Sequence, residues 1–317
     1  MGKSRTFLAA LITLALTAAA CGGQNAAQQG DGSLSGTVLV DGSSTVFPVT
    51  EAVAEEFQRE NRGVQVTVGV SGTGGGFKKF CAGETDISNA SRPIKDAEAT
   101  ECQAAGIEYE EVAVAIDALA VVVNNANDWI ADDCITPDQL KAMWDEGSTV
   151  RTWRDVDPSW PDTPIKFYAP GHDSGTFDYF TEAINGASQR SRTDGVQFSE
   201  DDNVLVQGVS GDRGAIGYFG HAYYEENADD LKVLKIDGGN GCVEPSRQTI
   251  QSDTYKPLAR PIYIYPKKAA AQRPEVAAFL RFYMENVNEL ASDVGYYPLP
   301  EAEFERYDQV VRSMTSG

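Results

Sequence analysis

The sequence contains little histidine, little cysteine and few positive charges. Only 2 histidines and 5 cysteines occur among 317 residues, and no close Cys/His spacing supports a structural zinc site. Lysine and arginine number 26 against 47 aspartate and glutamate residues, giving a formal net charge of -21. This surplus argues against nucleic acid as a partner. It does not exclude a small anion, because local dipoles decide binding in a cleft and distant charges are screened beyond about 8 Å.

Long apolar runs are missing except near the beginning of the chain. Phe7–Leu16 follows two basic residues and precedes small residues that end at Cys21, so residues 1–20 are predicted to be a secretory signal peptide. The run is too short for a spanning helix, which needs about 20 residues. Cys21 resembles the cysteine of a bacterial lipobox and would be lipidated, with residues 21–36 as a flexible tether. The alternative is an ordinary signal peptide with an unmodified Cys21.

The remaining cysteines form an even set, Cys81, Cys102, Cys134 and Cys242. In an exported chain such a set predicts two disulfides. Three pairings are possible. We favour Cys81 with Cys102 and Cys134 with Cys242, because the first two bracket one strand–helix unit and the others lie in the middle of the chain.

From residue 37 onward, short apolar strands alternate with amphipathic helices. Strands are predicted at 37–41 and 64–70, and the helix between them places Val49, Val53 and Phe57 on one face. This alternation is typical of an α/β protein. No internal repeat is present.

The length of the chain predicts two lobes joined by a hinge. A mature length of about 280 residues is large for a single hydrophobic core. We expect strands near 119–124 and 261–265 to pair antiparallel as the hinge. The predicted lobes are residues 37–118 plus 262–317 for lobe 1 and residues 119–261 for lobe 2.

Three short stretches place glycine and hydroxyl residues directly before predicted helices. They are Gly42–Thr45, Ser71–Gly76 and Asp173–Thr176. A helix start carries unpaired N–H groups and the positive end of the helix dipole, and hydroxyls add donors without bulk. Three such starts that converge would surround a dehydrated oxyanion. No Gly-Lys-Ser/Thr follows the glycines, so they do not form a nucleotide P-loop.

Six stretches, taken together, resemble one family. They are Asp41–Pro48, Val70–Phe77, Asp86–Ile94, Ala115–Asn124, Asp173–Phe177 and Gly214–Tyr218. In order and spacing they resemble the high-affinity phosphate-binding proteins of bacterial phosphate ABC importers. The resemblance implies a two-lobed, type II-like periplasmic-binding-protein fold with a ligand cleft between the lobes. It also implies an extracytoplasmic, lipid-anchored receptor that is not an enzyme, needs no metal or cofactor, and delivers inorganic phosphate to the importer's membrane subunits.

The resemblance also implies a set of phosphate-binding residues. They are Ser44, Thr45 and the Val46 amide, then Ser71 or Thr73, then Ser91 and Arg92, and from the other lobe Ser174, Gly175 and Thr176. Some family members have Asp at the position of Arg92 and an Arg within the segment that is Pro170–His172 in this chain. Because a guanidinium donates two parallel hydrogen bonds to phosphate, Arg92 is the expected cation.

A carboxylate should accept the proton that phosphate carries and sulfate lacks. The candidates are Asp117, which interrupts an apolar run, and Asp173, which also fits a helix N-cap. We favour Asp117.

Other functions remain as alternatives. A receptor for sulfate or molybdate would use the same donors. A secreted phosphate-ester hydrolase would need a metal cluster or a Ser/His/Asp set, for which His172 and Ser174 are the nearest candidates. The same fold could also serve an adhesin or a signalling receptor.

Overall fold

The structure is a computed structural model that describes residues 34–316. The predicted signal peptide, Cys21 and most of the predicted tether lie outside these residues. Gly36, which we assigned to the tether, is instead the first residue of strand β1 and pairs with Val64. Among the described residues, no helix is both long enough and apolar enough to cross a membrane.

A mixed sheet runs through both lobes. Its strand order is β2-β1-β3-β12-β4-β8-β6-β7, with β9 paired to β4. These strands are β1 (Gly36–Gly42), β2 (Val64–Val70), β3 (Ile87–Ala90), β4 (Val112–Asn124), β6 (Lys166–Pro170), β7 (Val196–Ser199), β8 (Ala215–Gly220), β9 (Leu231–Val233) and β12 (Ala259–Pro266). A smaller sheet contains β5 (Cys134–Ile135), β10 (Lys235–Asp237) and β11 (Cys242–Val243).

Helices alternate with the strands, as the sequence predicts. They are α1 (Phe47–Glu60), α2 (Gly72–Cys81), α3 (Asp96–Ala104), α4 (Pro137–Trp144), α5 (Trp153–Val156), α6 (Gly175–Phe180), α7 (Asp202–Ser210), α8 (His221–Glu226), α9 (Arg247–Gln251), α10 (Pro274–Asp293) and α11 (Glu301–Met314). A π-helical turn, Thr181–Asn185, continues α6. Short 3-10 segments lie at Ala131–Asp133 and Ala270–Gln272.

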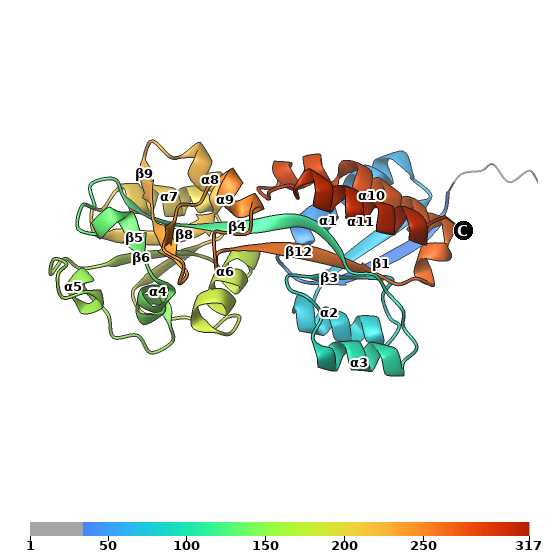
Figure 1. Ribbon diagram of the computed structural model, residues 1–317, viewed down its shortest axis with the longest axis horizontal. Helices are drawn as coiled ribbons and strands as arrows, with labels where there is room; N and C mark the ends of the chain where they lie inside the picture. The colour runs from blue at the N-terminus through green and yellow to red at the C-terminus, as the bar shows by residue number, and fades with distance from the viewer. Residues whose placement is uncertain (1–33, 317) are drawn as a thin grey trace, which may run out of the picture. The chain divides into compact units, whose positions relative to one another are not determined.

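Lobe 1 contains β1, β2, β3, β12 and the first half of β4. Helices α1, α10 and α11 cover one face of this sheet and α2 and α3 cover the other (Figure 1). The prediction for α1 is confirmed, because Val49, Val53 and Phe57 are all buried. Phe57 packs edge-on against Phe279 of α10, with ring centroids 5.3 Å apart. The apolar face of α1 therefore holds the loop that precedes it against the sheet.

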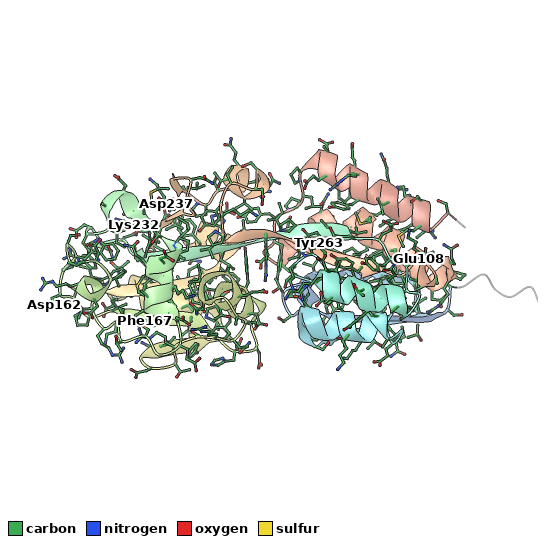
Figure 2. All side chains as sticks on the ribbon, turned by 60° about the horizontal axis from the view of Figure 1, so that its bottom comes forward. Glu108, Asp162, Phe167, Lys232, Asp237 and Tyr263 are labelled. Carbon is green, nitrogen blue, oxygen red and sulfur yellow. A yellow bond between two sulfur atoms is a disulfide. The ribbon has the colours of Figure 1, made fainter. Side chains whose placement is uncertain are left out.

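Lobe 2 contains the second half of β4 with β8, β6, β7 and β9, and helices α4 to α9. Its core is rich in aromatic side chains. Trp144 packs edge-on against Phe167 and Tyr218, with ring centroids 5.0 Å apart in both pairs. Figure 2 shows Phe167 inside this lobe and Tyr263 on β12. One buried cluster continues from this lobe into lobe 1, where it includes Phe77 and Tyr265.

The chain passes between the lobes through β4 and, on its return, at the start of β12 (Figure 1). The two strands pair antiparallel, but the predicted register is wrong. Residues 112–118 of β4 pair with β12, whereas residues 119–123 pair with β8. The 13-residue β4 is long enough to belong to both lobes, and β12 pairs with β3 in lobe 1 through residues 263–266. The chain therefore changes lobe near Ala118 and Ala259.

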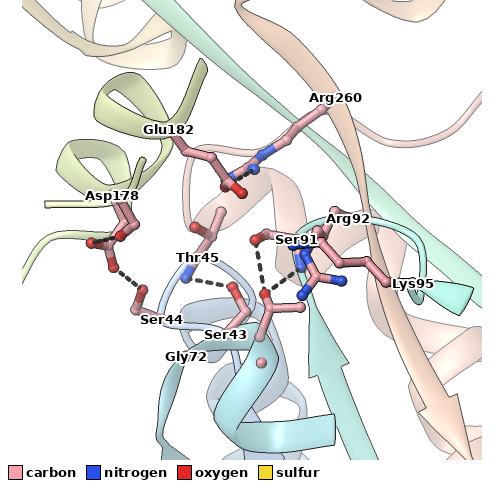
Figure 3. Close-up of a pocket in the computed structure, with 13 residues that line it drawn as sticks. Ser43, Ser44, Thr45, Gly72, Ser91, Arg92, Lys95, Asp178, Glu182 and Arg260 are labelled. Carbon is pink, nitrogen blue, oxygen red and sulfur yellow. Dashed lines mark hydrogen bonds and ion pairs between the residues drawn. The ribbon is translucent and has the colours of Figure 1, made fainter. Parts of the chain in front are cut away.

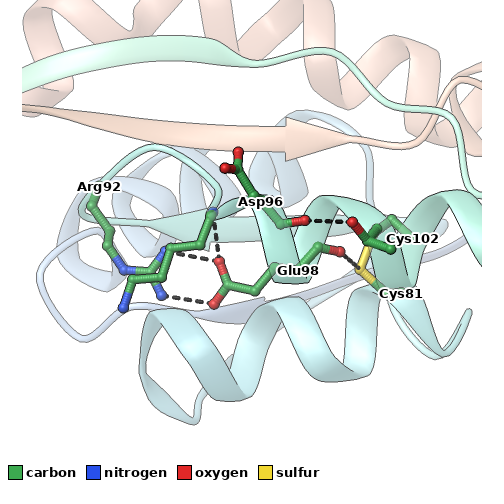
Figure 4. Close-up of a disulfide and its surroundings, with 7 residues drawn as sticks. Cys81, Arg92, Asp96, Glu98 and Cys102 are labelled. Carbon is green, nitrogen blue, oxygen red and sulfur yellow. Dashed lines mark hydrogen bonds and ion pairs between the residues drawn. A yellow bond between two sulfur atoms is a disulfide. The ribbon is translucent and has the colours of Figure 1, made fainter.

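Both favoured disulfides are confirmed. Cys81 and Cys102 join α2 to α3, as Figure 4 shows, with Cα atoms 4.3 Å apart. Cys134 and Cys242 join β5 to β11, with Cα atoms 5.8 Å apart. Each bridge lies within one lobe and leaves the crossing strands unconstrained.

Candidate functional site

A cavity of about 250 Å³ lies where the hydroxyl-rich loops of lobe 1 face helix α6 and the segment that follows it in lobe 2 (Figure 3). Its lining residues are Ser43, Ser44, Thr45, Gly72, Thr73, Gly74, Ser91, Arg92 and Lys95 from lobe 1, Asp178, Glu182 and Ser188 from lobe 2, and Arg260 from the crossing strand β12. Of the predicted site residues, Ser44, Thr45, Thr73, Ser91 and Arg92 are among them.

The first loop turns sharply from β1 into α1. Gly42 has a φ of +148°, and a Cβ there would lie 2.1 Å from the Asn89 carbonyl oxygen, so only glycine fits. The Ser43 hydroxyl accepts a hydrogen bond from the Thr45 amide at 3.2 Å. The Val46 amide donates to the Ser43 carbonyl, and the Val46 side chain is fully buried. The Val46 amide, predicted as a ligand donor, is therefore paired within the turn, and Val46 is absent from the cavity lining.

The second loop leads into α2. The first turn of this helix, Gly72 to Gly74, lines the cavity, so the unpaired N–H groups of a helix start face it. Thr73 Oγ1 lies 3.0 Å from Ser91 Oγ and accepts a hydrogen bond from the Ser91 amide. The Ser71 hydroxyl instead donates to Asp41, away from the cavity. Of the two predicted alternatives, the structure places Thr73 at the cavity and Ser71 outside it.

Arg92 is held in place by Glu98. Its Nη1 and Nη2 donate to the two carboxylate oxygens at 2.8 and 2.7 Å (Figure 4). Glu98 also accepts a hydrogen bond from the Lys95 amide at 2.9 Å. The hydrogen bonds to Glu98 raise the pKa of the Arg92 guanidinium. A guanidinium has five N–H donors, so this ion pair leaves donors for a ligand.

Neither predicted proton acceptor lines the cavity. Asp173 is exposed in the loop before α6, where Ser174 is the N-cap. Asp117 is 6% exposed on β4 and is absent from the cavity lining. A polar residue in an apolar run indicates burial, but it does not show which cavity the side chain faces.

The carboxylates at the cavity are Asp178 and Glu182. Asp178 Oδ2 accepts a hydrogen bond from Ser44 Oγ at 2.7 Å, and its Oδ1 accepts one from Ser188 Oγ at 2.7 Å. Glu182 accepts a hydrogen bond from Arg260 Nη1 at 3.0 Å. Asp178 and Glu182 are four residues apart along helical chain, so they share one face. In the sequence, these two acids follow the Ser174–Thr176 loop at a spacing of one helical turn. This spacing could have identified them as candidates, but the prediction from sequence did not use it.

Ser174, Gly175 and Thr176 make contact between the lobes or cap α6 and do not line the cavity. The Gly175 carbonyl accepts a hydrogen bond from Thr45 Oγ1 at 3.2 Å. A Cβ on Gly175 would lie 2.7 Å from Thr45 Cα, so the two backbones touch. Ser174 Oγ accepts the Thr176 amide as an N-cap.

Several other lining residues were not predicted from the sequence. They are Ser43, Gly72, Gly74, Lys95, Ser188 and Arg260. The first three adjoin predicted residues in the same loops, so the motifs pointed to the right segments. Lys95, Ser188 and Arg260 lie outside the three helix-start loops and carried no signal of their own.

Comparison with known proteins shows the family to which this chain belongs. The model of the PBP superfamily domain matches residues 27–287. Protein SphX of Synechococcus elongatus is 50% identical over 88% of this chain and 82% of its own. The phosphate-binding protein PstS of Staphylococcus saprophyticus is 40% identical over 96% of this chain and 92% of its own. A solved structure of a possible phosphate binding protein from Planctomyces limnophilus is 49% identical, with a TM-score of 0.85 over 89% of this chain and 99% of its own. This chain therefore belongs to the PBP superfamily and is a homologue of the PstS and SphX proteins.

Proposed function

We propose that this protein binds inorganic phosphate in the cavity between its lobes and delivers it to the membrane subunits of an ABC importer. The observation that carries the proposal is the cavity itself. One wall holds hydroxyls, the first turn of α2 and Arg92, and the opposite wall holds two carboxylates. The homology to a phosphate-binding PstS protein supports the same ligand.

The lobe 1 wall supplies the donors. Ser44, Thr45, Thr73 and Ser91 present hydroxyls, and Arg92 presents a guanidinium that Glu98 already orients. Charge-assisted hydrogen bonds contribute about 1.5–3 kcal/mol each, more than neutral ones. Because Glu98 fixes Arg92 before any ligand arrives, little side-chain entropy is lost on binding.

Asp178 is the proposed acceptor of the phosphate proton, in place of Asp117 and Asp173. Hydrogen bonds from Ser44 and Ser188 hold its carboxylate at the cavity. A fixed carboxylate accepts a hydrogen bond from a protonated oxygen of phosphate. Sulfate has no such proton and would leave two like charges in contact. The receptor should therefore prefer phosphate to sulfate. This expected preference argues against the alternative of a sulfate or molybdate receptor.

Binding would stabilise contact between the lobes. Thr45 reaches Gly175 and Ser44 reaches Asp178 across the cavity. A ligand that bonds to both walls favours the state in which they are close, and the crossing strands near Ala118 and Ala259 are the proposed hinge. An importer could then distinguish loaded from empty receptor by shape.

The hydrolase alternative finds no support in the geometry around His172. Its ring faces Gln189 and packs against Phe177, and Ser174 Oγ caps α6. A nucleophile and its base should be hydrogen-bonded to each other. We therefore propose a receptor without catalytic activity.

The proposed location is outside the cytoplasm, anchored through a lipid on Cys21. The two disulfides agree with an oxidising compartment. Mass spectrometry of protein extracted from membranes tests the anchor, because a lipidated Cys21 would be the new N-terminus. An unmodified Cys21 or an N-terminus elsewhere would contradict it.

Calorimetric titration of the purified protein with phosphate, arsenate and sulfate tests the ligand. We expect phosphate to bind tightly, arsenate to compete because it also carries a proton, and sulfate to bind far more weakly. Equal affinity for sulfate and phosphate would contradict the role of the carboxylate. No binding of phosphate would overturn the proposed function.

A further inference from the structure

Arg260 links the crossing strands to the cavity. It stands directly opposite Asp117 in the antiparallel pair of β12 and β4, so both side chains emerge on the same face of the sheet. Its guanidinium lies 3.6 Å over the ring of Tyr179 and reaches Glu182 across the cavity (Figure 3). A residue at the point where the chain changes lobe therefore presents a cation to the proposed phosphate site.

Asp117 carries a buried carboxylate oxygen without a hydrogen bond. Its Oδ2 has no partner among residues 34–316, and neither has Nε of Arg260. Such a group costs stability and needs an explanation. The carboxylate does not line the cavity, so direct contact with a ligand does not provide one.

The groups around Asp117 leave Arg260 as its only charged neighbour within the described part of the chain. Tyr179 of α6 and Tyr296, which follows α10, also face it, but their hydroxyls donate to the carbonyls of Pro257 and Thr45. Burial raises the pKa values of both tyrosines well above 10, so both are neutral. Burial also raises the pKa of Asp117 to about 6, against the opposing effect of Arg260.

We propose that Arg260 binds the anion directly and that Asp117, buried opposite it on β4, is the positioning residue whose charge keeps this guanidinium at the hinge. The proposal rests on the proposed function. An anion that enters the cavity competes with Glu182 for Arg260, while Asp117 remains opposite the guanidinium on β4. Binding of the anion then acts directly on Arg260, a residue of the crossing strand β12.

This arrangement links binding to proton uptake. A bound phosphate adds negative charge on the cavity side of Arg260, which makes the ionised form of Asp117 less favourable. Asp117 should therefore take up a fraction of a proton when phosphate binds. By linkage, its contribution to affinity grows as pH falls from 8 toward 6. Glu182, which accepts a hydrogen bond from Arg260, is the carboxylate that the anion displaces.

The experiment is titration of the purified protein with inorganic phosphate at pH 6 and pH 8, in buffers of different ionisation enthalpy. The wild type should take up a fraction of a proton more per phosphate bound at pH 6 than Asp117→Asn. Titration of phosphate itself contributes equally to both proteins. Arg260→Gln should weaken binding about tenfold or more, and Arg260→Lys should restore part of the loss. Glu182→Gln should tighten binding, a gain that a purely structural role would not produce.

Circular dichroism of each variant confirms that it is folded. If the wild type does not bind phosphate, the proposed function fails and this inference fails with it. If the wild type binds and Arg92→Ala does not, but Arg260→Gln binds normally, only the role of Arg260 is overturned. If Asp117→Asn takes up as many protons as the wild type, the role of Asp117 is overturned.

Discussion

The two walls of the cavity differ in chemistry and in construction. The lobe 1 wall is made of loops before α1 and α2 and after β3, and it presents hydroxyls, N–H groups and Arg92. The lobe 2 wall is one face of α6 and the turn after it, and its carboxylates are Asp178 and Glu182. One wall donates hydrogen bonds and the other accepts them. We therefore expect lobe 1 to supply most of the affinity for an oxyanion and lobe 2 to supply the selection among oxyanions.

The same sequence pattern has a different structural role in each lobe. Gly and hydroxyl residues stand at helix starts in both lobes, at Gly42–Thr45 before α1 and at Ser174–Thr176 at the start of α6. In lobe 1 Ser43, Ser44 and Thr45 line the cavity, whereas in lobe 2 Gly175 packs against the backbone of Thr45. The absence of a side chain at Gly175 allows the close approach of the lobes, while the hydroxyls of lobe 1 are the proposed ligand donors.

The largest expected effect is the loss of the lobe 1 guanidinium. Arg92→Ala removes charge-assisted hydrogen bonds worth about 3 kcal/mol in total, so phosphate affinity should fall about 100-fold. Arg59→Ala is the matched control, because Arg59 is exposed on α1 and pairs only with Glu56 among the described residues. Calorimetry measures both. A loss below threefold for Arg92→Ala would remove the donor role from this part of the wall.

The second prediction concerns the contact between the walls. Gly175→Ala places a Cβ 2.7 Å from Thr45 Cα, so the lobes must separate slightly. Overpacking of this kind costs about 2 kcal/mol, or roughly 30-fold in phosphate affinity. Small-angle scattering in saturating phosphate should show a larger radius of gyration than the wild type.

Gly220→Ala is the control for this variant, because a Cβ at Gly220 meets no atom within 4 Å in the described part of the chain. It should bind phosphate like the wild type. If Gly175→Ala keeps full affinity, the contact between Thr45 and Gly175 does not form in the bound state.

The sequence predicts most of one wall and little of the other. Hydroxyls and glycines at helix starts are local patterns, and the chemistry of a helix start is enough to make Ser44, Thr45 and Thr73 candidates. The same holds for the buried face of α1 and for the two disulfides. Each of these features depends on neighbouring residues or on a small number of pairings.

The remaining features depend on how distant segments meet. The register of β4 and β12 places Asp117 opposite Arg260, and Asp117 lies outside the cavity lining. Residues 117 and 260 are far apart in the chain, and no local pattern fixes their alignment. Asp178 and Glu182 look like solvent-exposed acids of a short helix until lobe 1 is placed against them. Sequence patterns identify donors better than acceptors here because acidic residues are common throughout this chain.

The third prediction tests which carboxylate selects the ligand. Asp178→Asn can donate a hydrogen bond to sulfate and loses the repulsive charge, so the ratio of phosphate to sulfate affinity should fall about tenfold. Asp173→Asn is the matched control, since Asp173 is exposed and outside the cavity. Competition titrations with the two anions measure the ratio. A change in Asp173→Asn alone would return the acceptor role to Asp173, the less favoured of the two candidates from the sequence.

The smallest effect on binding is expected at a contact between the lobes that is not part of the cavity lining. His221 of α8 hydrogen-bonds to the Tyr297 hydroxyl, which donates to Glu225. Burial lowers the pKa of His221 below 6.5 although Glu225 opposes this, so the unfolded chain binds the proton more readily. Stability from this group is complete above about pH 6.5 and is lost as pH falls toward the folded-state pKa. In thermal melts between pH 7 and pH 5, His221→Gln should therefore lose less Tm than the wild type. Its phosphate affinity at pH 7 should stay within about twofold of the wild type, because a contact outside both walls changes neither the donors nor the acceptors. A large loss of affinity would show that selection and closure are not confined to the two walls.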